Sequence, residues 1–415
     1  PYGTVPAALP PRRRPRRRRP CGSFSPFPKI SAKEAAAKAA GINAMKYGFI
    51  KVAAASPALR VADCRYTAEQ SAATMQKAAA AGVHLLVLPE LGLTGYTCGD
   101  LLLQPVLQQG ALHALQTLLA LSAELPLTTV AGLPLEVEGK LYNCAAVLHG
   151  GQILGVVPKT HLPNYGEFYE ARWFTPAPAE TKTISLLGQQ VPFGTDLLFC
   201  CRELPEYQLA LEICEDLWVA LPPSTRHAMA GATVIANCSA SDETIGKAEY
   251  RRTLVAGQSA RLMAGYLYAD AGRGESTTDM VFAGHDLIAE NGTILAEHAP
   301  FAPESGLLMT ELDLLTLTAE RRRNTTFVPE GEGVRAVTFS MPLRPTPLGR
   351  AVSPHPFVPD DAEQRFKRAG LLLTMQAHGL RKRLLHTGSR AALLPVTDDS
   401  DSVLALLVCA RTMDL

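Results

Sequence analysis

The chain has 415 residues, 47% hydrophobic and 6% aromatic, which is enough apolar material for two or three domains with buried cores. Its formal charge is +1, but residues 1–44 hold seven Arg, three Lys and one Glu, a net +9, which leaves −8 for residues 45–415. This acidic body argues against a nucleic-acid-binding role, and the lack of any run of 18 apolar residues argues against a transmembrane helix.

Residues 1–44 differ in composition from the rest of the chain. Arginines and prolines dominate residues 10–20, and residues 31–40 (SAKEAAAKAA) are typical of a short helical spacer. We predict a disordered, basic and proline-rich extension, with ordered structure beginning at Met45. The alternative is a targeting or nucleic-acid-binding tail, but a short arginine run alone is weak evidence for one. No apolar segment follows the arginines, so a secretory signal is not predicted.

Strand and helix patterns alternate from residue 47 onward. The first half contains five predicted elements and a hairpin whose turn is Gly150–Gly151. We predict strands at 48–56, 84–88 and 127–133, helices at 67–81 and 104–125, and the hairpin at 137–157.

The second half continues this pattern and then changes. We predict strands at 209–213 and 307–312, a helix at 249–265, and an Asn-Gly hairpin at 286–296. Strands that occur both singly and in hairpins indicate a layered α/β domain with mixed sheets, here assigned to residues 45–325. A proline-rich linker is predicted at 326–354. Residues 355–415 then form a separate segment, with a helix at 361–386 and a short strand–turn–helix pattern after it.

Three reactive side chains each follow an apolar strand pattern: Glu90, Lys159 and Cys214. Strand ends at the edge of an α/β sheet are common ligand sites. A thiol needs a base or a cation beside it to react at neutral pH, so these three types together suit covalent acyl transfer through a thioester. Taken singly, each has an ordinary explanation: a packed cysteine, a surface or helix-capping acid, and a solvated lysine.

The nine cysteines show no zinc-type spacing and no CxxC pair. We therefore predict no metal site, free thiols and a reduced, cytoplasmic protein.

The sequences around these residues resemble the nitrilase (carbon–nitrogen hydrolase) superfamily. They are LPELGLTGY, PKTHLPNYGEFYEARWF and EICEDLW. Longer strings resemble the glutaminase domain of the glutamine-dependent NAD(+) synthetases. These strings are TGYTCGDLL (94–102), NCSASDETIGKAEYRRTLV (237–255), GESTTDMVFAGHDLIAENG (274–292) and RRRNTTF (321–327).

The resemblance implies a four-layer α-β-β-α sandwich that hydrolyses L-glutamine to glutamate and ammonia. Glu90 then matches the general base, Lys159 the catalytic lysine and Cys214 the nucleophile. Three further residues fall where the family holds glutamine: Tyr165, Ser241 and Lys247. Either Glu167 or Glu170 would support Lys159, and the sequence does not choose between them.

Residues 355–394 resemble the start of the family's second domain, which uses ATP, Mg²⁺ and ammonia to convert deamido-NAD to NAD. The family's pyrophosphate loop reads Ser-Gly-Gly-Leu-Asp-Ser, but here Asp398 and Asp399 replace its glycine pair. Carboxylates at that place would repel pyrophosphate, so we predict that ATP does not bind productively. The resemblance also implies a homo-oligomer, and the incomplete second domain suggests a truncated or fragmentary gene.

Two alternatives remain open from the sequence. One is a stand-alone nitrilase-type ω-amidase that acts on glutamine or another amide. The other is a catalytically silent partner subunit. The apolar face of the helix at 361–386, which includes Leu371 to Leu373, Leu380, Leu384 and Leu385, is expected to promote association.

Overall fold

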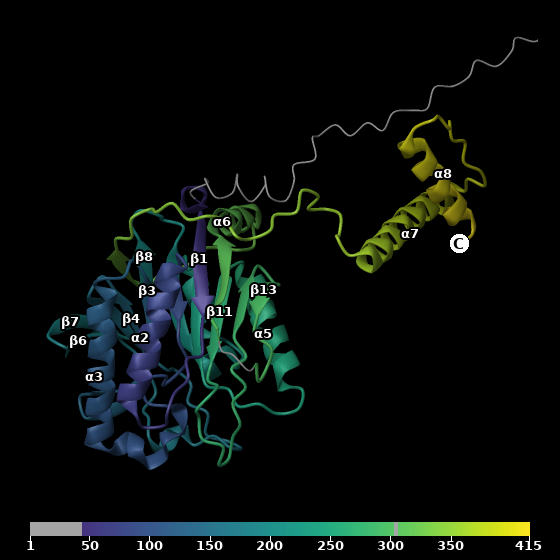
Figure 1. The fold of residues 1–415 in the computed structure, drawn as a ribbon. Helices are drawn as coiled ribbons and strands as arrows, with labels where there is room; N and C mark the ends of the chain where they lie inside the picture. The colour runs from purple at the N-terminus through teal and green to yellow at the C-terminus, as the bar shows by residue number, and fades with distance from the viewer. Residues whose placement is uncertain (1–43, 303–305) are drawn as a thin grey trace, which may run out of the picture. The chain divides into compact units, whose positions relative to one another are not determined.

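A computed structural model describes residues 44–302 and 306–415 (Figure 1). Of the predicted extension over residues 1–44, only Ala44 is among the described residues. The chain divides between Gly349 and Arg350 into two compact units, which are described separately here.

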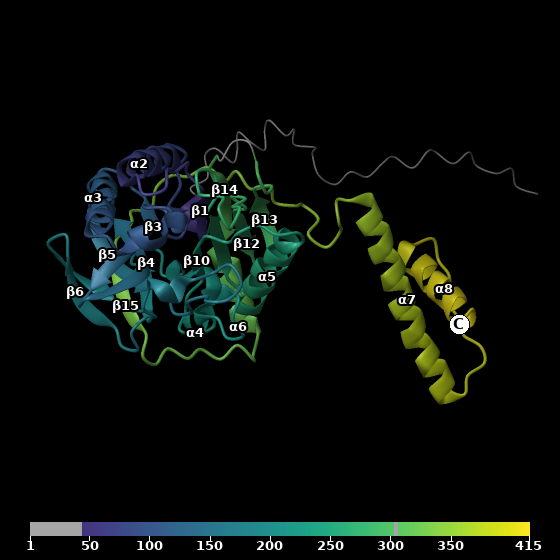
Figure 2. The same ribbon diagram turned by 90° about the horizontal axis from the view of Figure 1, so that it is seen from below.

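In the first unit, two β-sheets pack face to face between layers of helices (Figures 1 and 2). The eight-stranded sheet has the order β14 (Leu308–Asp313), β1 (Phe49–Ala54), β2 (Leu85–Val87), β3 (Thr128–Val137), β4 (Lys140–His149), β5 (Gln152–Pro158), β7 (Gln189–Phe193) and β6 (Lys182–Leu186). The seven-stranded sheet has the order β13 (Thr293–Glu297), β12 (Leu287–Glu290), β11 (Gly265–Asp270), β10 (Val234–Ser239), β9 (Gln208–Ile213), β8 (Leu197–Cys201) and β15 (Arg335–Phe339).

Helices cover the outer face of each sheet. The α-helices of this unit are α2 (Cys64–Ala80), α3 (Pro105–Ser122), α4 (Pro223–Met229), α5 (Lys247–Leu262) and α6 (Leu314–Arg323). Short 3₁₀ helices are η1 (Ala44–Tyr47), η2 (Tyr96–Leu103), η3 (Glu170–Arg172) and η4 (Cys214–Leu217). The predicted α-β-β-α sandwich is therefore confirmed, with α2 and α3 on one side and α4 and α5 on the other (Figure 2).

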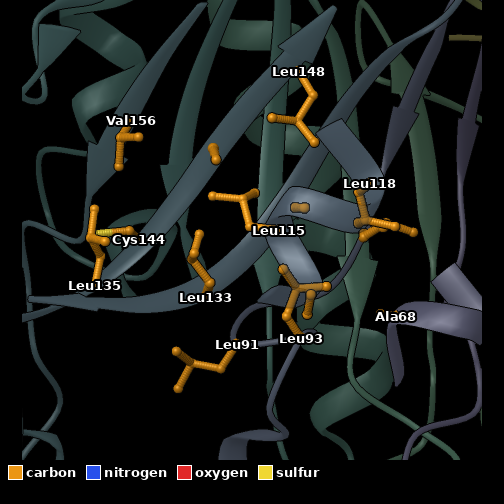
Figure 3. Packing of buried hydrophobic residues seen from close by; sticks show 14 of the residues in the cluster. Ala68, Leu91, Leu93, Leu115, Leu118, Leu133, Leu135, Cys144, Leu148 and Val156 are labelled. Carbon is orange, nitrogen blue, oxygen red and sulfur yellow. The ribbon is translucent and has the colours of Figure 1, made fainter. Parts of the chain in front are cut away.

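Three apolar layers hold the sandwich together. In the layer under α2 and α3, Leu115 and Leu118 of α3 pack against the first sheet, where Leu133 and Leu148 also point into the cluster (Figure 3). A second layer lies between the two sheets, and a third lies under α4 and α5. Each fully buried leucine contributes about 1.5–3 kcal/mol, so the core is ample for a stable domain.

Parallel strands bring the segments that follow β2, β5 and β9 to one edge of the sandwich. β1, β2 and β3 run parallel in the first sheet, and β9, β10 and β11 run parallel in the second. The two predicted hairpins form as β4–β5 and β12–β13. The chain leaves β2, β5 and β9 at Leu88, Lys159 and Cys214, so the segments that follow these strands carry all three candidate residues.

The predicted linker over 326–354 is wrong in its central part. Residues Arg335–Phe339 form β15, which pairs in parallel with β8 at the edge of the second sheet. Phe339 and Met341 are buried, and the Thr346 hydroxyl contacts His84 Nε2 at 3.3 Å. The prolines in this range flank the strand rather than interrupt it, and β8 offers its free edge to the ladder.

The second unit is a pair of helices, α7 (Ala362–Thr387) and α8 (Ser400–Met413). The Thr412 hydroxyl of α8 donates to the Ala377 carbonyl of α7 at 3.2 Å. The strand of the pattern predicted after residue 386 is absent, since residues 350–415, all described, contain no strand with which it could pair. Among the described residues, no helix is both long and apolar enough to cross a membrane.

Candidate active site

Two carboxylates and one ammonium group meet in a buried position at the strand ends. Lys159 Nζ lies 2.7 Å from Glu90 Oε1 and 2.6 Å from Glu170 Oε1, and all three side chains are essentially inaccessible. Of the two glutamates that the sequence offered as support for Lys159, the structure thus selects Glu170. An uncompensated buried charge is very costly, so this ionic cluster is stable only because its members are paired and hydrogen-bonded.

Glu90 is held by groups from both sheets. Its Oε1 also accepts from Asn143 Nδ2 of β4 at 2.6 Å, and its Oε2 accepts from the Ala240 N–H, just past β10, at 2.9 Å. A side chain on Gly132 of β3 would collide with the carbonyl oxygen of Pro89, so glycine permits the close turn that carries Glu90. The carboxylate is therefore fixed in orientation before any substrate binds.

Lys159 keeps its proton in this environment. Burial lowers the pKa of Lys159, but Glu170 and Glu90 more than offset this and hold it well above its ordinary value. The Tyr96 hydroxyl donates to Glu170 Oε1 at 2.9 Å and fixes the second carboxylate in turn. Lys159 is thus a permanent, oriented cation able to stabilise an oxyanion.

Cys214 begins η4 immediately after β9 and has a backbone φ of 45°. This left-handed conformation costs a non-glycine residue on the order of 1–2 kcal/mol, so the surroundings must hold it. Its N–H donates to Asn237 Oδ1 at 3.1 Å, and only 6% of the residue is exposed. Burial raises the pKa of the Cys214 thiol, with Glu90 adding to the rise and Lys159 opposing it. The thiol is therefore neutral at rest and needs a base to react.

The three residues matched to glutamine binding lie in different settings. Tyr165 is 59% exposed, and its hydroxyl donates to Glu215 Oε1 at 2.8 Å. Lys247 pairs with Asp242, and its ammonium lies 5.4 Å from the Phe168 ring centroid.

The same Phe168 ring stacks edge-on with Tyr165, which brings Tyr165 and Lys247 to one neighbourhood. Ser241 is buried instead. Its Oγ accepts from Arg251 Nη2 at 3.1 Å, and its N–H donates to Asp270 Oδ1 at 2.9 Å.

Sequence reasoning missed two amides that shape the site, Asn143 and Asn237. Each is a single amide in a run of buried strand residues, and this is the signal that marks a polar group with a specific buried partner.

Among the described residues, no group of three or more potential ligands forms a metal site.

The carbon-nitrogen hydrolase family profile matches residues 51–322. This chain belongs to the carbon-nitrogen hydrolase family. It is 40% identical over 384 residues to the glutamine-dependent NAD(+) synthetase of Mycobacterium bovis, covering 90% of this chain and 56% of that protein. The chain thus spans about half the length of the curated relatives that it matches.

Solved structures of this family have the same fold. A glutamine-dependent NAD(+) synthetase from Cytophaga hutchinsonii superimposes with a TM-score of 0.57 at 30% identity, over 65% of this chain and 43% of that one. A nitrilase-superfamily amidase from Nesterenkonia, 22% identical with a TM-score of 0.51, covers 66% of this chain and 96% of its own, and shows the fold alone.

Proposed function

We propose that this carbon-nitrogen hydrolase cleaves the side-chain amide of L-glutamine with Glu90, Lys159 and Cys214. The observation that carries the proposal is the buried Glu90–Lys159–Glu170 cluster beside a strained cysteine at the same strand ends. A fixed base, a fixed cation and a neutral thiol are the parts that thioester chemistry requires.

The proposed reaction has two halves. Cys214 Sγ attacks the amide carbon while its proton passes to Glu90, and Lys159 stabilises the oxyanion. Glu90 returns the proton to the leaving nitrogen, so ammonia departs and a thioester remains. Water then gives a proton to Glu90, and the water oxygen attacks the thioester carbon. Glu90 finally protonates the departing thiolate, which releases glutamate and restores the enzyme.

Opposite charges near the site support an amino-acid substrate. Glu215, adjacent to the nucleophile and held by Tyr165, suits an α-ammonium group. Lys247 suits the α-carboxylate, and Ser241 is fixed on the loop that carries the partner of Lys247. We propose these as the glutamine contacts.

We further propose that the released ammonia is not used by residues 355–415 for ATP-dependent amide formation. Asp399 caps the N-terminus of α8, and its Oδ1 accepts from the Ser402 N–H at 2.8 Å. This carboxylate accepts the hydrogen bond of an N–H group that a phosphate would need, and Asp398 adds a second negative charge. The residues present therefore do not fit ATP or its Mg²⁺.

An ammonia-release assay on L-glutamine tests both proposals. Wild type should release ammonia, Cys214→Ala should release none, and Glu90→Gln should lower kcat by roughly 10²–10⁴-fold. Adding ATP, Mg²⁺ and deamido-NAD should yield no NAD, even with ammonium chloride supplied. Equal activity of wild type and Cys214→Ala would refute the triad. Preference for another ω-amide in a substrate panel would favour the amidase alternative, and NAD formation would refute the second proposal.

A further inference from the structure

A hydrogen-bonded chain of buried side chains runs from the nucleophile into the helix-covered face of the second sheet. Cys214 donates its backbone N–H to Asn237 Oδ1 at 3.1 Å. Asn237 Nδ2 donates to the Tyr266 hydroxyl at 3.0 Å, and that hydroxyl donates to Glu212 Oε1. Glu212 Oε2 accepts the Ser224 N–H at 2.8 Å. All these groups are buried, so water does not compete for them.

We propose that Asn237 is a positioning residue for Cys214 and that Tyr266 and Glu212 fix the orientation of its amide. The inference rests on the proposed role of Cys214 as the nucleophile. Asn237 is opposite Glu212 in the parallel β9–β10 ladder, so its amide lies beside the point where the chain leaves β9. There it can hold Cys214, which adopts the left-handed conformation directly after the strand.

The direction of the hydrogen bonds allows only one orientation of the amide. Because the Tyr266 O–H donates its hydrogen bond to Glu212, the Tyr266 oxygen acts as the acceptor toward Asn237, and it accepts from the Asn237 NH₂. A flipped amide would set its NH₂ against the Cys214 N–H, two donors facing each other. Glu212 and Tyr266 thus keep the carbonyl of Asn237 aimed at the nucleophile's backbone.

This arrangement separates holding the cysteine from activating it. The Cys214 N–H is bound by Asn237, whereas the thiol interacts with Glu90, Lys159 and the side chain of Ser239. Loss of the Asn237 carbonyl would release the strained backbone and move Sγ away from its productive position. A displacement of about 1 Å at a reacting atom costs roughly 10²-fold in rate.

The test compares Asn237→Leu, Asn237→Asp and Tyr266→Phe with a matched control, Ser259→Ala. Ser259 is equally buried in the same layer, where its hydroxyl donates to the Ala264 carbonyl at 2.7 Å. Two readouts are needed: kcat and KM for glutamine, and the rate of Cys214 alkylation by iodoacetamide. Peptide mass spectrometry follows the alkylation, with Cys200 in the same sample as the internal reference.

Asn237→Leu should lower kcat by roughly 10–100-fold with little change in KM, and should slow Cys214 alkylation by a comparable factor. Asn237→Asp keeps the acceptor and should retain more activity than Asn237→Leu. Tyr266→Phe, the mildest change, should fall between wild type and Asn237→Leu. Ser259→Ala should lose stability but keep both rates.

Unchanged kcat and unchanged alkylation in folded Asn237→Leu would overturn the inference. If that variant does not fold, the same result in Tyr266→Phe overturns it. If wild type hydrolyses no glutamine, the proposed function fails, but slower Cys214 alkylation in the variants still supports the positioning role.

Discussion

At the scale of single residues, the carboxyl of Glu170 makes the stability of the protein depend on pH. Burial raises the pKa of Glu170 to about 7, opposed by Lys159 and reinforced by Glu90. The folded protein therefore holds a proton that the unfolded chain releases between about pH 4.5 and 7, so the free energy of unfolding falls as the pH rises through this window. Across this pH window, the free energy of unfolding of wild type should fall by up to roughly 3 kcal/mol more than that of Glu170→Gln, which carries no titrating proton.

Urea unfolding at pH 4.5, 5.5 and 7 measures this difference. Glu167→Gln is the matched control, because Glu167 is partly exposed and lies on the same loop. Its pH dependence should follow that of wild type. Parallel curves for wild type and Glu170→Gln would show that Glu170 does not hold the extra proton.

The same cluster shows which site residues can be predicted from the sequence. The sequence predicts Glu90, Lys159 and Cys214 as site residues because each follows an apolar strand and stands in a sequence that resembles the family. The choice of Glu170 over Glu167 could not be made, since Glu167 lies in an irregular segment and Glu170 begins the three-residue 3₁₀ helix η3, and neither has a period that tells which side faces inward. The sequence shows Asn237 as a lone amide in a buried strand, but it does not show the partner of that amide, which is a backbone N–H.

At the scale of elements, β15 makes the stretch after α6 part of the sandwich. Met341 follows this strand and is fully buried among residues of both sheets. Met341→Ala should therefore lower the free energy of unfolding by about 2–5 kcal/mol. Leu343→Ala is the control, because Leu343 is 39% exposed, and it should change stability by less than about 0.5 kcal/mol. Denaturant unfolding followed by circular dichroism makes the comparison, and equal small losses would restore the linker interpretation.

Turn chemistry and periodicity explain which elements were predictable. Gly150–Gly151 and Asn291–Gly292 lie at the turns of the two predicted hairpins, and all four residues have positive φ. Helices α2, α3 and α5 form where the sequence predicts helices, and α5 was predicted from apolar residues at helical spacing. β15 was not predicted because prolines flank it, and the strand predicted after residue 386 has no neighbouring strand with which to pair. Strand formation depends on a partner that local sequence does not reveal.

At the scale of the whole molecule, the helix pair of the second unit leaves much apolar surface exposed. Leu371, Leu372 and Met375 of α7 are 53–62% exposed, and Leu406 and Leu407 of α8 are similarly open. Only Ala377, Val408 and Thr412 are buried among the residues of these two helices. Such a face is expected to be covered by association with another surface.

We therefore predict that the full chain self-associates through this helix pair as its concentration rises. Sedimentation velocity from about 1 to 100 μM, a range typical for exposed apolar faces to aggregate, should show a mass that rises above the 44.5 kDa of one chain. Leu371→Glu combined with Leu372→Glu should shift this association to higher concentration, because it removes apolar surface and adds charge. Gln376→Glu is the control, since it adds charge at an exposed position of the same helix without removing a leucine. A single-chain mass at every concentration would show that the apolar face stays exposed to water. Association that persists in the leucine variant would place the contact on the first unit.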